Sequence, residues 1–232
     1  MSLFDTTTIE CPNCETLSDH PAAGSVNADR RPDLRTEILS GTFQVLRCPS
    51  CSEEMRLEPL FNYLDVENGL WMAAYPDRQI GEFSVLEGAV QTLFDASYGG
   101  SATPSAQEVG ELLKARLTFG WPAAQEKLLL ATQGIDDVSI EMMKLDLMRR
   151  LPSAPLQPGV ELRVVGVEDD TFDLVWIDAG SEEVLEEFAV ERVLLTEIEN
   201  NPEGWAALRE SLTTGMFVDM QKLYLDSADT AA

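Results

Sequence analysis

The hydrophobic residues of the N-terminal third fall into short runs that are typical of β-strands. Residues 6–10 and 42–47 are β-branched or alternating, and each run leads directly into a pair of cysteines. Further apolar runs at 55–64 and 70–75 flank Asn68-Gly69, a dipeptide that favours a tight hairpin turn. We therefore expect two strands that each deliver a cysteine pair, followed by a β-hairpin.

Residues 17–32 differ from these runs because they have no apolar period and are rich in Ser, Asp, Pro, Gly and Asn. Such a composition is typical of a loop. Residues 33–40, which end before Gly41, predict one or two helical turns.

From residue 82 the apolar positions recur every three to four residues, which predicts amphipathic helices. Ser105 and Glu108 form a capping-box pattern, and Gly120-Trp121-Pro122 marks a break before a new helix. The expected helices cover residues 82–97, 105–117, 122–133 and 137–151.

The C-terminal third returns to strand patterns. Residues 152–158 carry three prolines and indicate a linker. Alternating runs then predict strands at 161–167, 172–177 and 184–190. A helix is expected from Pro202, and residues 226–232 indicate a frayed tail.

Charge narrows the range of partners. The 232 residues carry a formal net charge of −25, which opposes the negative field of nucleic acids and anionic lipids. Residues 151–200 form an acidic pole, with two basic and 13 acidic side chains. We expect no nucleic-acid or membrane binding, and we expect a partner to be another protein with a basic surface.

The sequence also gives an expected compartment. No apolar run approaches the roughly 18 residues that a membrane span needs. The N-terminus lacks the cationic and apolar segments of a secretory signal. We therefore expect a cytoplasmic protein, and the sequence does not indicate its oligomeric state.

All the cysteines occur in two matching tetrapeptides, Cys11-Pro12-Asn13-Cys14 and Cys48-Pro49-Ser50-Cys51. In a chain without an export signal, two such pairs favour metal ligation over disulfides. Four thiolates suit a tetrahedral zinc ion, and they also suit a single iron, as in rubredoxin-like electron carriers. A thiol redox role usually needs the first cysteine of a pair at a helix N-terminus, which neither tetrapeptide predicts.

Other residues with reactive side chains favour structural roles. His20 is the only histidine, and because four cysteines complete a ligand set we expect it to be an exposed loop residue. Asp136 and Asp137 are expected to cap a helix, and Asp169 and Asp170 to form a solvated turn.

The remaining charged and aromatic groups support the same view. A glutamate run is expected to be a solvated face, because no glycine-punctuated calcium-loop spacing surrounds Glu182, Glu183, Glu186 and Glu187. The tryptophans are expected in the core, at Trp71, Trp121, Trp176 and Trp205. With one histidine and no nucleotide-binding, nucleophile-elbow or metalloprotease motif, the sequence weighs against an enzyme.

The two tetrapeptides also carry a resemblance to a known family. Together with Ile38-Leu39-Ser40-Gly41-Thr42-Phe43, Tyr63-Leu64-Asp65 and the segments 125–128 and 134–144, they resemble the CpXC family of bacterial and archaeal proteins. The resemblance implies a zinc-ribbon-like unit and no known reaction. It implies four metal ligands, which correspond here to Cys11, Cys14, Cys48 and Cys51.

One local feature departs from the usual zinc knuckle. Knuckles commonly place glycine after the second cysteine, because the turn needs a permissive backbone. This chain has Glu15 and Ser52 at those positions.

These observations predict an α+β fold in three parts that pack as one body. They are a zinc-ribbon-like module with a β-hairpin at 1–78, a helical segment at 79–151, and an acidic β-rich unit with a terminal helix or strand at 159–226. The favoured function is a non-enzymatic protein-interaction or adaptor role. The alternatives are an electron-transfer or thiol redox protein that uses the same cysteines, and an enzyme with carboxylate chemistry in a cleft.

Overall fold

A computed structural model of the protein describes residues 2–151, 157 and 159–229. The fold is mixed α and β, as expected from the sequence. Most of the predicted proline linker, residues 152–156 and 158, lies outside the described residues.

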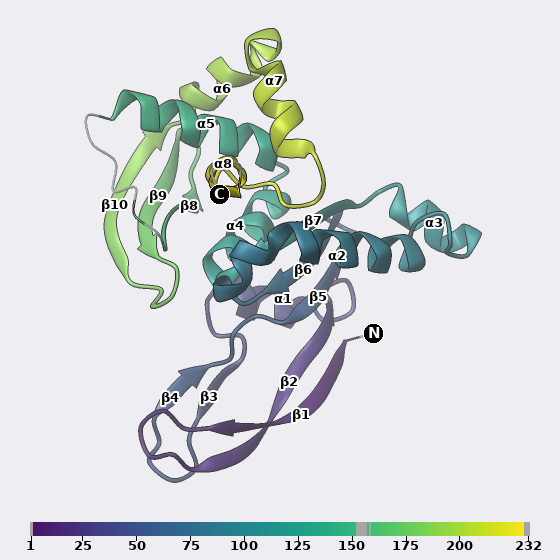
Figure 1. The fold of residues 1–232 in the computed structure, drawn as a ribbon, viewed down its shortest axis with the longest axis vertical. Coiled ribbons are helices and arrows are strands. Elements are labelled where there is room, and N and C mark those ends of the chain that lie inside the picture. Colours follow the sequence, from purple (N-terminus) through teal and green to yellow (C-terminus); the bar gives the residue numbers. More distant parts are fainter. Residues whose placement is uncertain (1, 152–156, 158, 230–232) are drawn as a thin grey trace.

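A five-stranded sheet has the order β1-β2-β5-β6-β7, and its strands β5, β6 and β7 lie in the middle of the molecule (Figure 1). Its strands are β1 (Leu3–Glu10), β2 (Leu17–Asn27), β5 (Phe61–Asp65), β6 (Leu70–Tyr75) and β7 (Lys114–Phe119). The β2–β5 and β6–β7 pairs are parallel, and the other neighbours are antiparallel. Nearly all of β6 is buried, as befits a strand that is covered on both faces.

The predicted hairpin is confirmed by β5 and β6. Its strands pair from Phe61 with Ala74 to Asp65 with Leu70. The turn ends at Gly69, which has a φ of 64°, and a Cβ there would lie 2.9 Å from the carbonyl oxygen of Leu112. Both observations explain why this position needs glycine.

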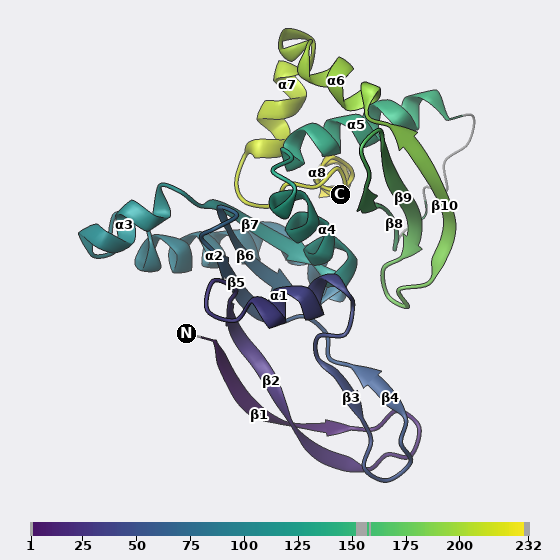
Figure 2. The same cartoon turned by 180° about the vertical axis from the view of Figure 1, so that it is seen from behind.

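Helices cover both faces of the central sheet. On one face, α1 (Pro32–Leu39) and α4 (Gly120–Thr132) bury a cluster that includes Trp121 (Figure 2). On the other face, α2 (Phe83–Ser97) contributes Phe83 to a second cluster. A 3₁₀ helix, η1 (Asp77–Glu82), connects β6 to α2. The helices predicted at 33–40, 82–97 and 122–133 are thus confirmed with small changes in their bounds.

The helix predicted at 105–117 is wrong in its second half. Helix α3 (Pro104–Gly110) is short, its N-cap Thr103 makes no side-chain cap hydrogen bond, and the next element is strand β7. A Cβ at Gly110 would lie 2.2 Å from the carbonyl oxygen of Tyr98, so only glycine fits where the helix ends. In β7 the side chains alternate, with Leu117 in the α2-side cluster, which is strand behaviour.

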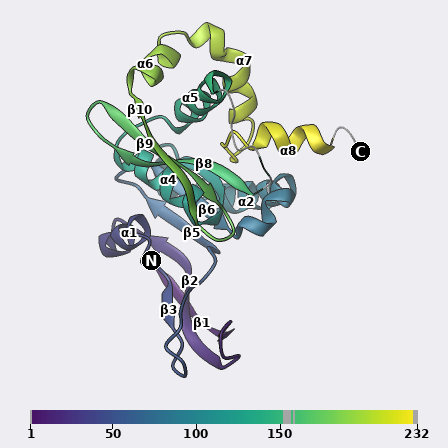
Figure 3. The same cartoon turned by 90° about the vertical axis from the view of Figure 1, so that its left-hand side faces the viewer.

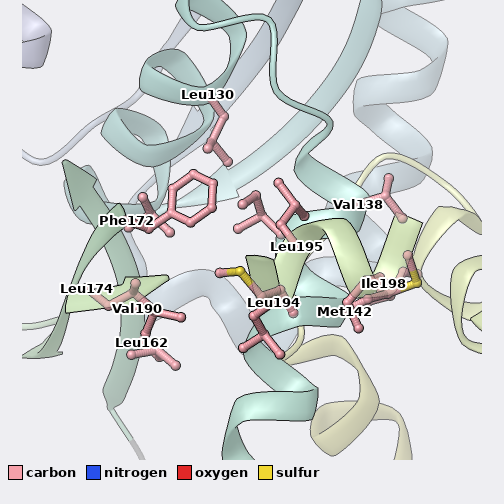
Figure 4. Close-up of a cluster of buried hydrophobic side chains, with 14 of the residues drawn as sticks. Leu130, Val138, Met142, Leu162, Phe172, Leu174, Val190, Leu194, Leu195 and Ile198 are labelled. Carbon is pink, nitrogen blue, oxygen red and sulfur yellow. The ribbon is translucent and has the colours of Figure 1, made fainter. Parts of the chain in front are cut away.

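The C-terminal part has its own sheet and core. Strands β8 (Val160–Val167), β9 (Thr171–Asp178) and β10 (Val184–Glu191) form an antiparallel sheet, which confirms the three predicted strands. Its core is shared with α4 and with three further helices: α5 (Asp137–Arg150), α6 (Val193–Glu199) and α7 (Pro202–Thr213). Figure 4 shows Phe172 and Leu174 of the sheet in the same cluster as Leu194 and Leu195 of α6.

The structure adds detail at two places in the predicted division of the chain, residue 78 and the C-terminal segment. The central sheet contains strands from both sides of residue 78, because β7 pairs with β6. The segment predicted as a frayed tail is helical as far as Asp229, the last residue of α8 (Lys222–Asp229).

The loop predicted at 17–32 is also wrong, because residues 17–27 form β2. This strand pairs with β1 from Leu17 to Ser25 and with β5 only through residues 25–27, so the rest of the β1–β2 pair projects as an arm. A small hairpin of β3 (Val45–Arg47) and β4 (Glu54–Arg56) lies beside it (Figure 3). We call these two hairpins, residues 3–27 and 45–56, the arm.

Candidate metal centre

Each cysteine pair occupies the turn of a hairpin. The first pair connects β1 to β2, and the second connects β3 to β4. The two turns meet at the end of the arm that lies away from the helices (Figure 1). The strands predicted before each pair are confirmed, and each is followed by a second strand that returns along it.

The two turns use the same backbone hydrogen bonds. In the first, Glu15 N donates to Cys11 O at 2.9 Å and Cys11 N donates to Thr16 O at 3.0 Å. In the second, Ser52 N donates to Cys48 O at 2.9 Å and Cys48 N donates to Glu53 O at 2.8 Å. The repeated sequence therefore encodes a repeated structure, with the first cysteine of each pair held at the same point of its turn.

Glu15 and Ser52 adopt the backbone conformation that glycine would make easy. Their φ angles are 57° and 64°, in the left-handed region. That conformation costs an L-residue roughly 1 kcal/mol. Although neither residue is a glycine, both turns keep the left-handed backbone conformation that glycine favours at this position.

The four cysteine sulfur atoms lie together. All four fall within 4.8 Å of one another, and the Cys11–Cys51 and Cys14–Cys48 sulfur pairs are each 3.6 Å apart. A disulfide requires about 2.05 Å, so these are free cysteines rather than bridged ones. Cys11 and Cys48 are buried, and the other two are half-buried. The four sulfurs are thus close enough to bind one metal ion.

Hydrogen bonds surround the sulfur cluster. Ser50 N donates to Cys48 Sγ at 3.4 Å, and Asn13 Nδ2 lies 3.7 Å from Cys51 Sγ as a donor. Cys14 Sγ and Thr16 Oγ1 are 3.3 Å apart. Such outer contacts orient ligands and stabilise thiolate charge.

The thiols of Cys14 and Cys51 differ in pKa. The hydrogen bond to the Thr16 hydroxyl lowers the pKa of Cys14 to about 6. The backbone N–H of Glu53 favours the Cys51 thiolate, but loss of hydration and the three neighbouring sulfurs raise the pKa of Cys51 to about 12. The Cys14 thiolate therefore forms readily, whereas ionisation of Cys51 needs a compensating cation.

The base of the arm is anchored to the body. Leu57, the first residue after β4, accepts a hydrogen bond from Trp121 Nε1 at 2.8 Å and donates its N–H to Gln44 O at 3.0 Å. Gln44 Oε1 in turn accepts from Ala23 N of β2 at 2.6 Å. Helix α4, the second hairpin and the first hairpin are thus connected in sequence.

The other predicted site residues take structural roles. His20 is half-buried in β2 rather than in a loop, where its Nε2 lies 2.8 Å from Ser18 Oγ, and it is not part of the sulfur group. Asp136 caps α5 by accepting from Ser139 N, as expected. Asp169 and Asp170 are exposed in the β8–β9 turn, also as expected.

Four glutamates were expected to be exposed and four tryptophans to be buried, and each group has one exception. Glu183, Glu186 and Glu187 are exposed, whereas Glu182 forms an ion pair with Arg56. Three tryptophans are buried, and Trp205 packs against the C-terminal core from a half-buried position.

The structure reveals a buried charge network that the sequence analysis missed. It connects α4, α5, β8 and the segment before α8. Short ion pairs join Lys144 to Glu126 at 2.6 Å and Arg163 to Asp219 at 2.6 Å. Its members are nearly inaccessible to solvent: Glu126, Lys127, Asp137, Glu141, Lys144, Glu161, Arg163 and Asp219. The only sequence signal was the presence of charges on helices that also carry many apolar residues.

Part of this network borders a cavity. The cavity has a volume of about 440 Å³ and is lined by Glu161, Arg163 and Asp219 among mostly apolar side chains. Buried ionisable groups beside a cavity are a common feature of functional sites.

A second acidic group is already neutralised. Asp29, Asp65 and Glu67 lie close together, but Arg35 makes two 2.9 Å hydrogen bonds to Asp65 and one of 3.1 Å to Glu67. Asp29 accepts the backbone N–H groups of Val66 and Glu67. These contacts explain the cluster as a brace between α1 and the β5–β6 turn.

The helices of the described residues include none with the length and apolar character that crossing a membrane requires.

Comparison with known proteins gives one match. No curated protein and no solved structure matches the chain. The family model described as CpXC protein matches residues 9–144, which contain both cysteine pairs, the central sheet from β2 to β7, α4 and the first part of α5. The match covers more than half of the 232 residues, and the chain therefore belongs to the CpXC family.

Proposed function

We propose that the four cysteines bind one structural zinc ion and that the arm serves as the interaction module of a non-enzymatic adaptor protein. The observation that carries the proposal is the convergence of four sulfurs, from two hairpin turns, at the exposed end of the arm. Two hairpins whose turns each supply two ligands match a zinc-ribbon-like unit.

The sulfur spacing supports a tetrahedral ion. Zinc–thiolate bonds of about 2.3 Å place neighbouring sulfurs about 3.8 Å apart in a tetrahedron. Two of the sulfur pairs here are each 3.6 Å apart, and all four sulfurs lie within 4.8 Å of one another. The sulfurs therefore fit zinc with little movement, and the same geometry also accepts a single iron.

A structural role follows from the ligand set. Four protein thiolates fill the coordination of zinc and leave no open position for water or substrate. His20 lies outside the sulfur group, so no imidazole replaces a thiolate. The ion supplies folding energy to the arm and takes no part in a reaction.

The arm needs such an ion because it lacks a core of its own. Nearly all of β1 is exposed, and so are alternate residues of the first part of β2. The three hydrophobic clusters of the described residues contain no cysteine. Metal binding rather than hydrophobic burial therefore holds the two turns together.

The exposed strand supports an interaction role. β1 is at the edge of the central sheet, and an exposed edge offers its backbone to an added strand. The net charge of −25 favours a basic protein as the partner, because complementary charge speeds association. The reduced thiolates fit the cytoplasm as the working compartment.

A carboxylate-based enzyme is the second candidate. The observation that favours it is the cavity beside Glu161 and Asp219, where two buried carboxylates meet. Electron transfer or thiol exchange by the cysteines is the remaining alternative, and metal identity separates it from the adaptor role.

The test combines metal analysis with a salt-dependent pull-down of the full chain. We expect one zinc per chain, no visible colour, and recovery of a basic protein at low salt that is lost at high salt and with Cys48→Ser. Ser50→Ala is the matched control, because it changes the same turn without removing a ligand. A coloured, iron-containing protein with a reversible redox wave would replace the adaptor with an electron carrier.

A further inference from the structure

The cavity of about 440 Å³ lies between the C-terminal sheet and the body. Its walls come from η1, the start of β8, β9 and the first turns of α8, which the ribbon places beside β8 (Figure 1). Apolar side chains make most of the surface: Ile80, Leu162, Trp176, Met220 and Leu225. A volume in this range suits a small molecule.

The polar floor of the cavity is built from buried charges. Glu161, Arg163 and Asp219 are each 2% exposed, and all three line the cavity. Burial of charged groups is costly unless they are paired, so the balance of donors and acceptors at this floor determines what it can bind.

The Arg163 guanidinium is directed at protein carboxylates. Its Nε donates to Glu161 Oε2 at 2.8 Å, and its Nη1 donates to Glu126 at 3.0 Å and to Asp219 at 2.6 Å. Its Nη2 lies 2.7 Å from Glu161 Oε2. All three nitrogens of the guanidinium are thus directed at protein carboxylates.

The carboxylates, by contrast, keep spare capacity. Each carboxylate oxygen accepts about two hydrogen bonds. Glu161 Oε1 accepts from Gln221 Nε2 at 2.6 Å, and Asp219 Oδ1 accepts from Gln221 N at 2.9 Å. Beyond Arg163, these are the contacts to the two carboxylates among the described residues, so acceptors exceed donors at the floor.

The formal charges of the buried groups also sum to a negative value. Glu126 is compensated from the other side by Lys144, 2.6 Å away. Across the whole network four cations face five carboxylates, so the carboxylates exceed the cations by one: Arg116, Lys127, Lys144 and Arg163 against Glu126, Asp137, Glu141, Glu161 and Asp219. Burial and the neighbouring Asp219 raise the pKa of Glu161 despite the Arg163 guanidinium, as expected of a carboxylate that lacks enough positive charge around it.

We propose that this cavity binds a small organic cation, namely an amine whose ammonium group faces Glu161 and Asp219 and whose apolar body packs against Ile80 and Trp176. An ammonium supplies both the missing charge and N–H donors for the free acceptor positions. A carboxylate or phosphate ligand adds negative charge beside Glu161 and Asp219, and a neutral alkyl group leaves these two carboxylates undercompensated. The proposal is independent of the metal centre.

The experiment uses the full chain with three probes of equal length: hexylamine, 1-hexanol and hexanoate. Calorimetric titration at fixed ionic strength measures each affinity. We expect hexylamine to bind with one site per chain, 1-hexanol to bind at least ten times more weakly, and hexanoate not to bind. Equal affinity for hexylamine and 1-hexanol, or no binding of hexylamine, overturns the proposal.

Two pairs of variants separate the cavity from the general acidity of the chain. Ile80→Trp fills the cavity without touching the ionic floor and is expected to abolish hexylamine binding, whereas Val85→Trp, on the exposed surface of α2, leaves it unchanged. Asp219→Asn is expected to weaken binding at least tenfold, whereas Glu210→Gln, an exposed carboxylate of α7, has no effect.

The proposal can still be tested if one of these variants does not fold. If Asp219→Asn unfolds the chain, the comparison of Ile80→Trp with Val85→Trp still decides the outcome. Undiminished hexylamine binding to Ile80→Trp shows that the amine binds elsewhere on the acidic surface, and it overturns the proposal.

Discussion

Arg56 and Glu182, which are 126 residues apart, form an ion pair with 2.8 Å between Nη1 and Oε2. Arg56 is the last residue of β4 in the arm, and Glu182 lies in the turn between β9 and β10. The Arg56 guanidinium also stacks over the ring of Trp121, 4.1 Å from its centroid. One side chain thus contacts the arm, the body and the C-terminal sheet at once.

Replacement of Arg56 by Met is expected to lower the free energy of unfolding by about 1 to 2 kcal/mol. The variant loses a cation–π contact and a partly buried ion pair while it keeps the aliphatic stem. Urea denaturation measures the change. The control is Arg47→Met, because Arg47 pairs with Glu54 on the exposed surface and is expected to cost less than about 0.5 kcal/mol. Equal effects of the two variants would contradict the bridging role.

Glu15→Gly and Ser52→Gly are expected to strengthen metal binding. Both positions have positive φ angles, so glycine removes a conformational cost of roughly 1 kcal/mol at each, which corresponds to about a fivefold gain in affinity. Competition with a chelator measures zinc affinity. Glu53→Gly is the control, because this neighbouring residue has no positive φ and glycine only adds flexibility there. Unchanged or weaker affinity in both variants would show that the turns are not strained.

Cys48→Ser is expected to abolish stoichiometric metal binding and to open the arm to proteases, while the body stays folded. The physical reason is that the hydrophobic clusters of the described residues include no cysteine. Limited proteolysis with mass spectrometry locates the first cuts, which we expect before residue 60. Ser50→Ala should retain both metal and resistance. Collapse of the whole chain in Cys48→Ser would argue that the metal supports more than the arm.

Asp137→Asn is expected to cost about 3 kcal/mol at neutral pH, because it leaves Arg116 without a buried anion and Lys127 with Glu141 alone. Although burial opposes its ionisation, these two cations hold the pKa of Asp137 well below its usual range. A carboxyl with a depressed folded pKa stabilises the fold fully above its unfolded pKa of about 4. That contribution is lost as the pH falls from there towards the folded value.

The difference in unfolding free energy between wild type and Asp137→Asn should therefore be constant above about pH 5 and shrink at lower pH. Denaturation across a pH series measures it. Asp33→Asn is the control, because Asp33 pairs with Arg31 on the exposed surface and should change stability little. A difference that grows at acid pH would have the wrong sign for this explanation.

The elements that the sequence predicted correctly have one clear buried face or one clear end signal. The β5–β6 hairpin has the Asn68-Gly69 turn, and α5 has Asp136 as its cap. β2 was missed because a strand that is exposed along most of its length leaves no hydrophobic alternation. β7 was missed because the Ser105 pattern suggested a longer helix, and the contact of Gly110 with Tyr98 is visible only after folding.

The functional groups of the protein also differ in how far the sequence predicts them. Spacing alone grouped the four cysteines, because ligand type and distance along the chain carry the signal. The buried network was not predictable, since a charged residue on a helix normally indicates a solvated face. Only the fold brings Glu126 within 3.0 Å of Arg163, and only the fold shows that both side chains are buried.

The hydrogen bond from Trp121 to Leu57 gives the protein an optical reporter at the base of the arm. The indole is buried in α4, yet its N–H donates to the first residue after β4 and its face lies under the Arg56 guanidinium. Arg56 ends the hairpin that the second cysteine pair closes and Leu57 follows it directly, so loosening of that hairpin changes the polarity around this ring. The fluorescence emission of Trp121 is therefore expected to report whether the four-cysteine cluster, which has no chromophore of its own, holds that hairpin closed.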